Sequence, residues 1–271
     1  MFLEHVHEGS ERRRELTGRM DPLRGLKNCV AFLTIIPVGM DRDGINQAAT
    51  YMPFFPLVGG VIGLIAGTSV WAFRWILPET ISGILGVAIL LLITGVHHTD
   101  GLLDFGDAIM VRGSRLSKLR VLHDNRSGAG AISLGIVVLA TTALSLAGVN
   151  SVAVIQVMVA SEAAAKFVLV FLAWAGKSAC RGMSTPFVIA NHRQSRWFRL
   201  TASLIFLLIF CLPTLGLRGV LISLSAITTG AVMLKVSTSQ FGGITGDVMG
   251  AANDLTRMTS LLTIVVASKW L

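Results

Sequence analysis

Three aspartates at helical spacing have the types and positions of a metal–phosphate site. Asp100, Asp104 and Asp107 follow one another at i, i+4 and i+7, so a helix would carry them on one face. If the preceding apolar segment continues into this helix, its C-terminal dipole adds to their mutual repulsion. A hard divalent cation relieves that repulsion, and Mg²⁺ typically binds one or two carboxylates together with substrate phosphates. We therefore predict a Mg²⁺ site here; the alternative is a solvated acidic turn.

A second polar segment near the C-terminus supplies two further aspartates. Asp247 and Asp254 are seven residues apart, and Asn253 precedes Asp254. Gly246 and Gly250 lie at i and i+4, and such a strip of small residues lets another helix approach closely. We expect the strip to draw the second acidic face against the first. The alternative is a helix start whose acids suit the helix dipole.

The segment HDNRSGAG, residues 123–130, lies between the two acidic segments. Asp124 would add a metal ligand or orient a nucleophile, and Arg126 carries a permanent charge that forks onto phosphate. The residues after Arg126 open the next apolar helix, where free N–H groups favour an anion. For Arg126 the alternative is an anchor of membrane topology. Zinc is not expected, because no His or Cys at zinc spacing partners the nearby histidines: His97, His98 and His123.

Other charged residues lie within or between apolar stretches. Glu162 and Lys166, at i and i+4, are interpreted as a buried ion pair, or as groups that hold a polar substrate. Arg181 is expected to bind phosphate. The basic run 192–199 would do the same, although lipid head groups suit it better.

The composition indicates what must position these residues. Of the 271 residues, 53% are hydrophobic and 14% are charged, and the mean hydropathy is +0.71. A soluble domain usually carries about a quarter charged residues, so this chain has too little charge to cover a globular surface. A soluble enzyme, a disordered protein and a nucleic-acid-binding module are thereby excluded. Apolar runs of about 20 residues predict an all-α, polytopic membrane helix bundle.

The apolar runs predict six or seven transmembrane helices. The run at 28–38 has 11 residues, too few to cross a hydrocarbon core of about 30 Å, and is interpreted as a re-entrant or interfacial segment. The predicted spans are 56–77, 81–96, 129–148, 151–175, 200–217, 220–236 and a final helix that starts near 246 and includes 258–271.

Basic residues orient the predicted bundle. The net charge is +8, and Lys and Arg gather in the N-terminal arm, 1–27, and in two long connections, 97–128 and 176–199. The positive-inside rule places all three in the cytoplasm, and an even number of spans puts 237–257 on the same side. We expect an integral protein of the cell membrane whose acidic segments face the cytoplasm. Residues 1–27 would form a polar basic arm, and 28–271 a single membrane catalytic domain.

The motifs at these residues resemble those of the cobalamin synthase family, also called adenosylcobinamide-GDP ribazoletransferases. Members carry a pattern close to H-x-D-G-L-x-D-x-x-D-A/G, matched at 98–108, and T-G-D-x-x-G-A, matched at 245–251. A K-D-S-R-x-G-like element is matched at 123–128, with His123 in place of Lys. Shorter elements, F-L-T-x-I-P and P-L-V-G, match 32–37 and 56–59.

The resemblance implies a Mg²⁺-dependent membrane transferase of the cobalamin nucleotide-loop pathway. Such an enzyme joins adenosylcobinamide-GDP to α-ribazole or its 5′-phosphate, giving adenosylcobalamin or its 5′-phosphate and releasing GMP. The implied metal ligands are Asp100, Asp104, Asp107 and Asp247, and the implied catalytic residues are Asp104, Asp124 and Asp254. The implied substrate-binding residues are His98, Arg126, Arg181, Thr245 and Asn253. Membrane lipid is a further expected partner, nucleic acid is not, and a homo-oligomer is left open.

Two alternative functions are kept open. A membrane prenyltransferase or a CDP-alcohol phosphotransferase also places aspartates at the cytoplasmic edge of a helical bundle, but the spacing here departs from N-D-x-x-D-x-x-x-D and from D-x-x-D-G-x-x-A-R. A divalent-cation transporter is the non-enzymatic alternative. Its acids should lie near the membrane midplane, where this sequence predicts only Glu162.

Overall fold

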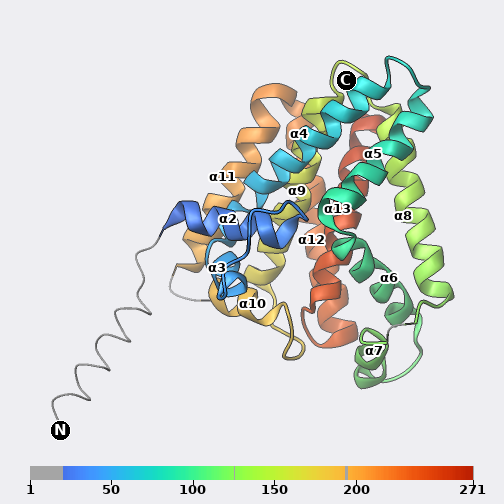
Figure 1. Cartoon of the computed structure of the whole chain (residues 1–271). Coiled ribbons are helices and arrows are strands. Elements are labelled where there is room, and N and C mark those ends of the chain that lie inside the picture. The colour runs from blue at the N-terminus through green and yellow to red at the C-terminus, as the bar shows by residue number, and fades with distance from the viewer. Residues whose placement is uncertain (1–20, 125, 193–194, 271) are drawn as a thin grey trace, which may run out of the picture.

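The computed structural model describes residues 21–124, 126–192 and 195–270, and this part of the chain is all-α, as predicted (Figure 1). The elements are α2 (Pro22–Leu33), α3 (Gly44–Thr50), a 3₁₀ turn η1 (Met52–Phe54), α4 (Phe55–Phe73), α5 (Glu79–Thr94), α6 (His97–Met110), α7 (Arg115–Val121), α8 (Ala129–Gly148), α9 (Val154–Ala175), α10 (Thr185–Asn191), α11 (Arg196–Leu215), α12 (Leu217–Phe241) and α13 (Gly246–Ala267). Among these residues the β-structure is one isolated bridge, between Ser178 and Ile244.

Five helices in the described part of the chain are long and apolar enough to cross a membrane. They are Met52–Phe73, α8, α9, α11 and α12, and the bent pair α5–α6 makes a sixth if it counts as one span. The expected seventh span was wrong: α13 does not qualify, because its first half carries Asp247, Asp254 and Arg257. Five or six spans still make a polytopic membrane bundle.

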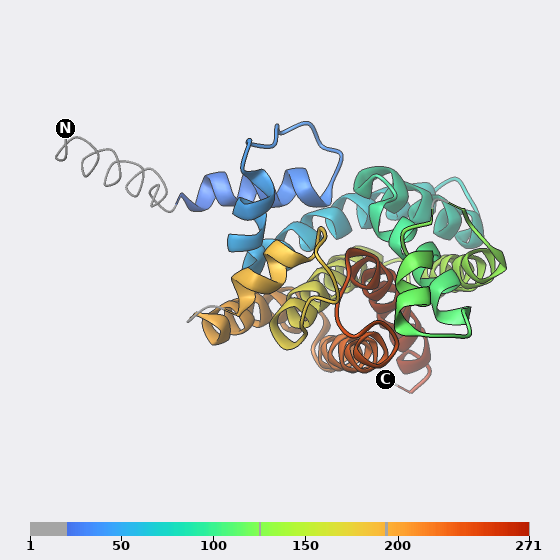
Figure 2. The same ribbon diagram turned by 90° about the horizontal axis from the view of Figure 1, so that it is seen from below.

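Helix α9 lies in the interior of the bundle, where it packs against α4, α11, α12 and α13 (Figure 2). Its side chains are buried on almost every face, including those of Glu162 and Lys166. Gly59 and Gly63 of α4 lie against the carbonyls of Glu162 and Met158, so close that a side chain at either glycine would overlap the α9 backbone. Small residues thus let α4 approach the central helix directly.

A sharp break separates α5 from α6. Gly95 and Val96 both have positive φ, 62° and 64°, and the two helices meet at 100°. Positive φ is costly for a β-branched residue such as Val96. The apolar helix α5 therefore does not run on into the acidic segment, and its C-terminal dipole does not add to the repulsion among these aspartates. Asp100 lies in the first turn of α6, where the helix dipole stabilises a negative charge instead of opposing it.

The N-terminal boundary also differs from the prediction. Asp21 caps α2 by accepting hydrogen bonds from the N–H groups of Leu23 (3.0 Å) and Arg24 (3.3 Å). Residues 22–27 therefore belong to a helix and not to the arm, while residues 1–20 of the predicted arm lie outside the described residues. With 12 residues, α2 is about 18 Å long, too short to cross a bilayer.

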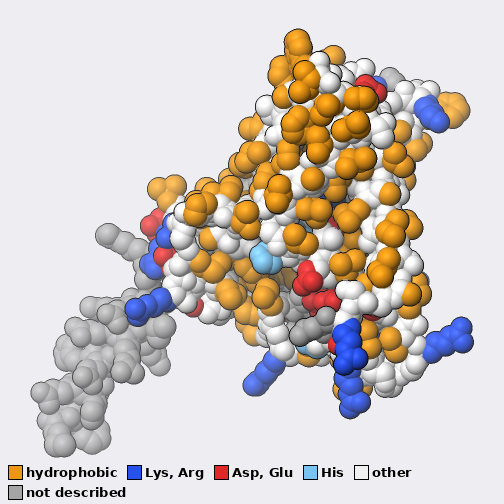
Figure 3. Space-filling view, turned by 45° about the vertical axis from the view of Figure 1, so that its right-hand side comes forward, with side chains coloured by type: hydrophobic (Ala, Val, Ile, Leu, Met, Phe, Trp, Pro, Cys, Tyr) orange, Lys and Arg blue, Asp and Glu red, His pale blue; other side chains and the backbone are white. Residues whose placement is uncertain are grey.

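Long and short connections lie at opposite ends of the bundle. In Figure 1 the lower end carries α7, α10 and the loop that leads into α13, and the upper end carries the turns after α4, α8 and α11. Most of the Lys and Arg side chains visible in Figure 3 lie at the lower end. Helix α6 runs from the break after α5 toward this basic end (Figure 1).

Candidate active site

The acidic helices α6 and α13 pack against each other at backbone distance. A Cβ atom at Gly101 would lie 2.8 Å from the Cα atom of Asp247, and one at Gly250 would lie 2.8 Å from the carbonyl oxygen of His98. Gly250 thus acts as the small residue that the sequence predicted. Gly246 does not share this role, since the nearest atom to its Cβ position is Cβ of Met183, at 3.8 Å. The predicted meeting of the two acidic segments is confirmed.

A cleft of about 680 Å³ opens beside this contact, within the usual range for small-molecule sites of about 300–1,000 Å³. Its polar wall combines α6, α13 and the loops that precede α8 and α10, and its opposite wall is apolar. The polar lining residues are His97, His98, Asp100, His123, Arg181, Ser184, Thr245 and Asp247. The apolar wall includes Phe32, Met40, Ile45, Phe55, Leu169 and Phe187. Figure 3 shows acidic side chains gathered beside a histidine, below an apolar face.

Like charges are concentrated at the polar wall. Asp100 and Asp247 line the cleft. Asp104 lies close to Asp100, Asp107 and Asp247, and their negative charges repel its own. Within the described part of the chain, the carboxylates of Asp100 and Asp104 have no hydrogen bond or ion pair. Asp247 accepts one long hydrogen bond, 3.4 Å, from the hydroxyl of Thr245. These three carboxylates are therefore not neutralised by basic side chains.

Asp107 has a different task from the one predicted. Its carboxylate accepts hydrogen bonds from the backbone N–H groups of Gly128 (2.5 Å) and Ala131 (2.9 Å), at the start of α8. The free N–H groups predicted to bind an anion do so, but the anion is this side chain from α6. Asp107 caps α8, which leaves its role as a metal ligand without support.

Asp254 lies outside the cleft lining, in the core of the bundle. Its two oxygens accept from the hydroxyl of Thr99 (2.7 Å), from Arg257 (2.7 Å) and from Asn253 (3.0 Å), and its side chain is 1% exposed. The position corrects the expected catalytic role of Asp254 and the expected substrate-binding role of Asn253. Both residues are fully engaged with protein partners.

The same network contains the predicted pair Glu162–Lys166. Lys166 donates to Glu162 (3.2 Å) and to the side-chain oxygen of Asn253 (2.8 Å), and Arg257 donates to both Glu162 oxygens. Two acids and two bases thus form a neutral cluster that joins α9, α13 and, through Thr99, α6. Buried charges are tolerated when they are paired in this way. The ion-pair interpretation is confirmed, and sequence reasoning did not identify Thr99 and Arg257 as members.

Only one of the three residues that the sequence singled out in the loop before α8 lines the cleft. Asp124 and Arg126 are exposed and lie outside the cleft lining, with Nε of Arg126 3.9 Å from Oδ1 of Asp124. His123 does line it, and it lies near both Asp104 and Asp247. Its Nδ1 lies 2.7 Å from the carbonyl oxygen of Leu119. Since a carbonyl only accepts, Nδ1 carries a proton and Nε2 is left as the acceptor in the neutral ring.

Arg181 and Thr245 lie on two loops, the one before α10 and the one before α13, that are joined by backbone hydrogen bonds. The N–H of Ile244 donates to the carbonyl of Lys177 (2.7 Å), and the N–H of Ala179 donates to the carbonyl of Ile244 (3.0 Å). The loop that carries Arg181 is therefore fixed beside the start of α13. The predicted residues His98, Arg181 and Thr245 all line the cleft.

The apolar wall is held by a contact that the sequence did not reveal. Asp41 accepts hydrogen bonds from Arg24 (2.7 Å), Lys27 (2.9 Å) and Asn28 (2.8 Å). The Arg24 guanidinium, with Asn28 and Lys27, holds the pKa of Asp41 well below its usual range. The loop next to Met40, a lining residue, is thereby fastened to α2.

The acids do not form a closed metal site by themselves. Among the described residues no three His, Cys, Asp or Glu side chains come together in a way that could hold a metal ion. Asp100, Asp104 and Asp247 nevertheless offer hard oxygen donors without basic partners. This donor set fits Mg²⁺, which takes few protein ligands and completes its shell with water and substrate phosphate.

Comparisons with known proteins agree with the motifs. Residues 25–265 match the model of a family described as cobalamin-5-phosphate synthase. Proteins named adenosylcobinamide-GDP ribazoletransferase are similar: one from Methanocella arvoryzae is 32% identical, covering 88% of this chain and 94% of its own length. Another from Methanosarcina mazei is 30% identical (91% and 93%), and one from Shewanella frigidimarina is 32% identical (87% and 92%).

No solved structure matches the chain. The family match and the names of the relatives give no support to a prenyltransferase, a CDP-alcohol phosphotransferase or a cation transporter. Since the match extends over most of the chain and includes both acidic helices and the loops around the cleft, this chain belongs to the cobalamin-5-phosphate synthase family.

Proposed function

We propose that this protein is an adenosylcobinamide-GDP ribazoletransferase that works in cobalamin biosynthesis. The ribose 3′-hydroxyl of α-ribazole, or of its 5′-phosphate, attacks the phosphorus that bears the cobinamide group. A new P–O bond forms, the bond to the bridging oxygen of the diphosphate breaks, and GMP leaves with that oxygen. The hydroxyl proton passes to a base. The observation that carries the proposal is the meeting of two unneutralised acidic helices at one cleft in a chain of this family.

Asp100 and Asp247 are the proposed ligands of Mg²⁺, with Asp104 beside them. All three carboxylates lack basic partners, and the first two line the cleft. Mg²⁺ held by these carboxylates would supply positive charge for the diphosphate oxygens of the leaving GMP. Without that charge, the acidic wall would repel a diphosphate. Substrate and ion are therefore expected to bind together.

His123 is the proposed proton acceptor. Its Nδ1 is occupied by the Leu119 carbonyl, so the lone pair of Nε2 is available to a hydroxyl group. The neighbouring carboxylates of Asp104 and Asp247 stabilise the imidazolium that forms. The exposed Asp124, one residue further on, does not line the cleft, so the base is His123 and not Asp124.

The proposed orientation places the cleft at the cytoplasmic face of the cell membrane. The long basic connections lie at the same end of the bundle as the acidic segments, and the positive-inside rule assigns that end to the cytoplasm. Water-soluble nucleotide substrates would then enter from the compartment in which they are made.

The test is GMP release by the purified protein from adenosylcobinamide-GDP and α-ribazole, with and without Mg²⁺. We expect Asp104→Asn to abolish release while the protein still folds in detergent. Asp124→Asn makes the same chemical change at an exposed position outside the cleft and should retain activity. Full activity of Asp104→Asn would contradict the metal assignment. Turnover of isoprenoid or CDP-alcohol substrates, in place of adenosylcobinamide-GDP, would contradict the proposed function itself.

A further inference from the structure

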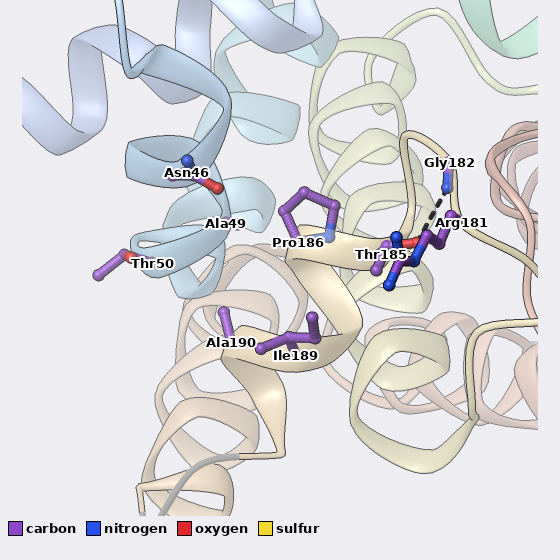
Figure 4. A pocket seen from close by; sticks show the side chains of 9 residues that line it. All are labelled: Asn46, Ala49, Thr50, Arg181, Gly182, Thr185, Pro186, Ile189 and Ala190. Carbon is purple, nitrogen blue, oxygen red and sulfur yellow. Dashed lines mark hydrogen bonds between the residues drawn. The ribbon is translucent and has the colours of Figure 1, made fainter.

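A second pocket, of about 410 Å³, adjoins the cleft (Figure 4). It lies between α3 and α10, and it shares Arg181 and Gly182 with the cleft lining. Figure 4 shows α3 on one side of the pocket, α10 in the middle and Arg181 at the opposite end. The described residues that line it are Asn46, Ala49, Thr50, Arg181, Gly182, Thr185, Pro186, Ile189 and Ala190. The two cavities thus meet at Arg181 and Gly182, and Arg181 is the charged residue of the two.

The charge of this pocket is opposite to that of the cleft's acidic wall. Arg181 is the one charged side chain among the described residues that line the pocket, and within the described part of the chain it has no hydrogen bond or ion pair. Arg199 adds positive charge nearby, where it donates to the carbonyl of Thr50 (2.6 Å). An unpaired guanidinium beside hydroxyl and amide groups suits a phosphate monoester, which it can bind through two parallel hydrogen bonds.

The pocket has a fixed position relative to the acidic wall. Thr185 accepts from the N–H of Gly182 (3.0 Å) and donates to the carbonyl of Cys180 (3.1 Å), which braces the loop around Arg181. The hydroxyl of Ser184 donates to the carbonyl of Ile244 (3.3 Å), three residues before Asp247. The arginine and the acids are therefore parts of one braced unit. A molecule that spans both cavities would meet a metal-binding end and a metal-free cationic end.

The proposed reaction includes a substrate phosphate that takes no part in the bond-breaking step. The family is described by a product that carries a 5-phosphate, whereas the relatives are named for ribazole transfer. That phosphate does not come from the diphosphate chemistry, so it must arrive on the acceptor. Without Mg²⁺ of its own, it would be repelled by Asp100 and Asp247 and attracted by Arg181.

We propose that the pocket between α3 and α10 binds the 5′-phosphate of the ribazole acceptor, and that Arg181 holds this phosphate. The inference rests on the proposed function and adds to it the place, and the residue, that recognise the phosphate of a phosphorylated acceptor. Arg181 acts on the acceptor phosphate, so its loss should weaken the binding of the phosphorylated acceptor more than that of the GDP-bearing substrate.

The test compares the two acceptors, α-ribazole and α-ribazole 5′-phosphate, in GMP-release kinetics with saturating adenosylcobinamide-GDP. For Arg181→Ala we expect the KM of the phosphorylated acceptor to rise about 10- to 100-fold, as for the loss of a charge-assisted contact. The KM of free α-ribazole should rise much less, so that the ratio of kcat/KM for the two acceptors shifts about 10- to 100-fold toward the free nucleoside. Arg112→Ala removes the same charge from an exposed position outside both cavities and should behave as the wild type.

A second pair of variants separates the effect of charge in the pocket from the effect of side-chain shape. Ile189 lines the pocket and is 55% exposed, so substitution there should be tolerated. Ile189→Asp places a negative charge in the pocket, and Ile189→Asn is its neutral isostere. We expect only Ile189→Asp to raise the KM of the phosphorylated acceptor, and to leave that of the free nucleoside unchanged.

Four outcomes would overturn the inference while the proposed function stands. In the first, Arg181→Ala raises the KM of both acceptors equally; in the second, it changes the KM of neither. In the third, the wild type releases GMP with free α-ribazole but not with its 5′-phosphate. A lipid phosphate as the true occupant is a fourth such outcome. It would appear as competition with the phosphorylated acceptor in nanodiscs of anionic phospholipid, absent in phospholipid-free detergent. If the wild type releases GMP with neither acceptor, the proposed function fails and this inference falls with it.

Discussion

The contact between α6 and α13 can be tested by adding one methyl group. In Gly250→Ala the new Cβ atom would lie 2.8 Å from the carbonyl oxygen of His98 and 3.3 Å from the Cα atom of Gly101. Both neighbours are backbone atoms, so no side-chain rotation relieves the overlap. Ordinary contact begins at 3.4 Å, and the helices must therefore separate by about 0.6 Å at this point. Overpacking of this kind costs about 1–3 kcal/mol.

The separation should weaken catalysis more than folding. Asp100 lies on α6 and Asp247 on α13, so a shift between the helices changes the distance between the two proposed ligands. A misplacement of about 1 Å can cost about 100-fold in rate, and we expect kcat/KM to fall at least tenfold. The Mg²⁺ concentration for half-maximal GMP release should rise. Activity would be measured over a Mg²⁺ titration, and folding by thermal unfolding in detergent.

Gly246→Ala is the matched control on the same helix. Its added methyl lies 3.8 Å from the nearest atom, Cβ of Met183, which is ordinary van der Waals contact. Because Gly246 also lines the cleft, the comparison is made on thermal stability and on the Mg²⁺ requirement. The reasoning is refuted if both variants have the same Tm and the same Mg²⁺ half-saturation.

Three further perturbations test the surroundings of the site. Arg257→Met leaves Glu162 and Asp254 with an excess of buried negative charge, so we expect a loss of about 3–5 kcal/mol, measured by unfolding in detergent; a loss under 1 kcal/mol would contradict the pairing. Asp107→Ala removes the cap of α8 and should cost about 1 kcal/mol without raising the Mg²⁺ requirement, whereas a metal ligand at this position would raise it. The pKa of Asp41 is lowered on folding, so its contribution to stability is complete above the ordinary carboxyl pKa of about 3.9 and is lost as pH falls through the lower folded value. Asp41→Asn should therefore increase hydrogen exchange in residues 38–43 at neutral pH, with the difference from the wild type narrowing only below about pH 3.9; equal exchange at neutral pH would show that this contact does not hold the loop.

Helical spacing predicted part of the acidic site correctly and part of it wrongly. The i, i+4, i+7 pattern of α6 places Asp100, Asp104 and Asp107 close together, and their charges do interact. The pattern carries no information about neighbours from other segments. Asp107 meets the start of α8, whose free N–H groups take its carboxylate as their cap. A distant backbone segment thus removes one of three equivalent aspartates from the site.

The break before α6 could not be inferred from hydropathy. The apolar run predicts a span that ends near Val96, and it leaves open whether the helix continues into the acidic segment. Gly95 and Val96 instead adopt positive φ and turn the chain by 100°. Glycine makes one such residue easy, but the second is a valine, whose strain must be offset by the packing of α6 on α8 and α13.

The sequence by itself indicated that this protein lies in a membrane and that carboxylates carry its chemistry. Too few charges for a water-exposed surface predict a membrane bundle, and carboxylates at helical spacing, with a glycine that admits a second helix, predict a site where like charges meet. Tertiary structure alone decided which carboxylates are free to act. Asp254 lies seven residues beyond Asp247, about 10 Å further along α13, where the helix has entered the core and a carboxylate is stable only when paired. Asp247 remains in the first turn, at the cleft, because Gly250 brings α6 and α13 together there.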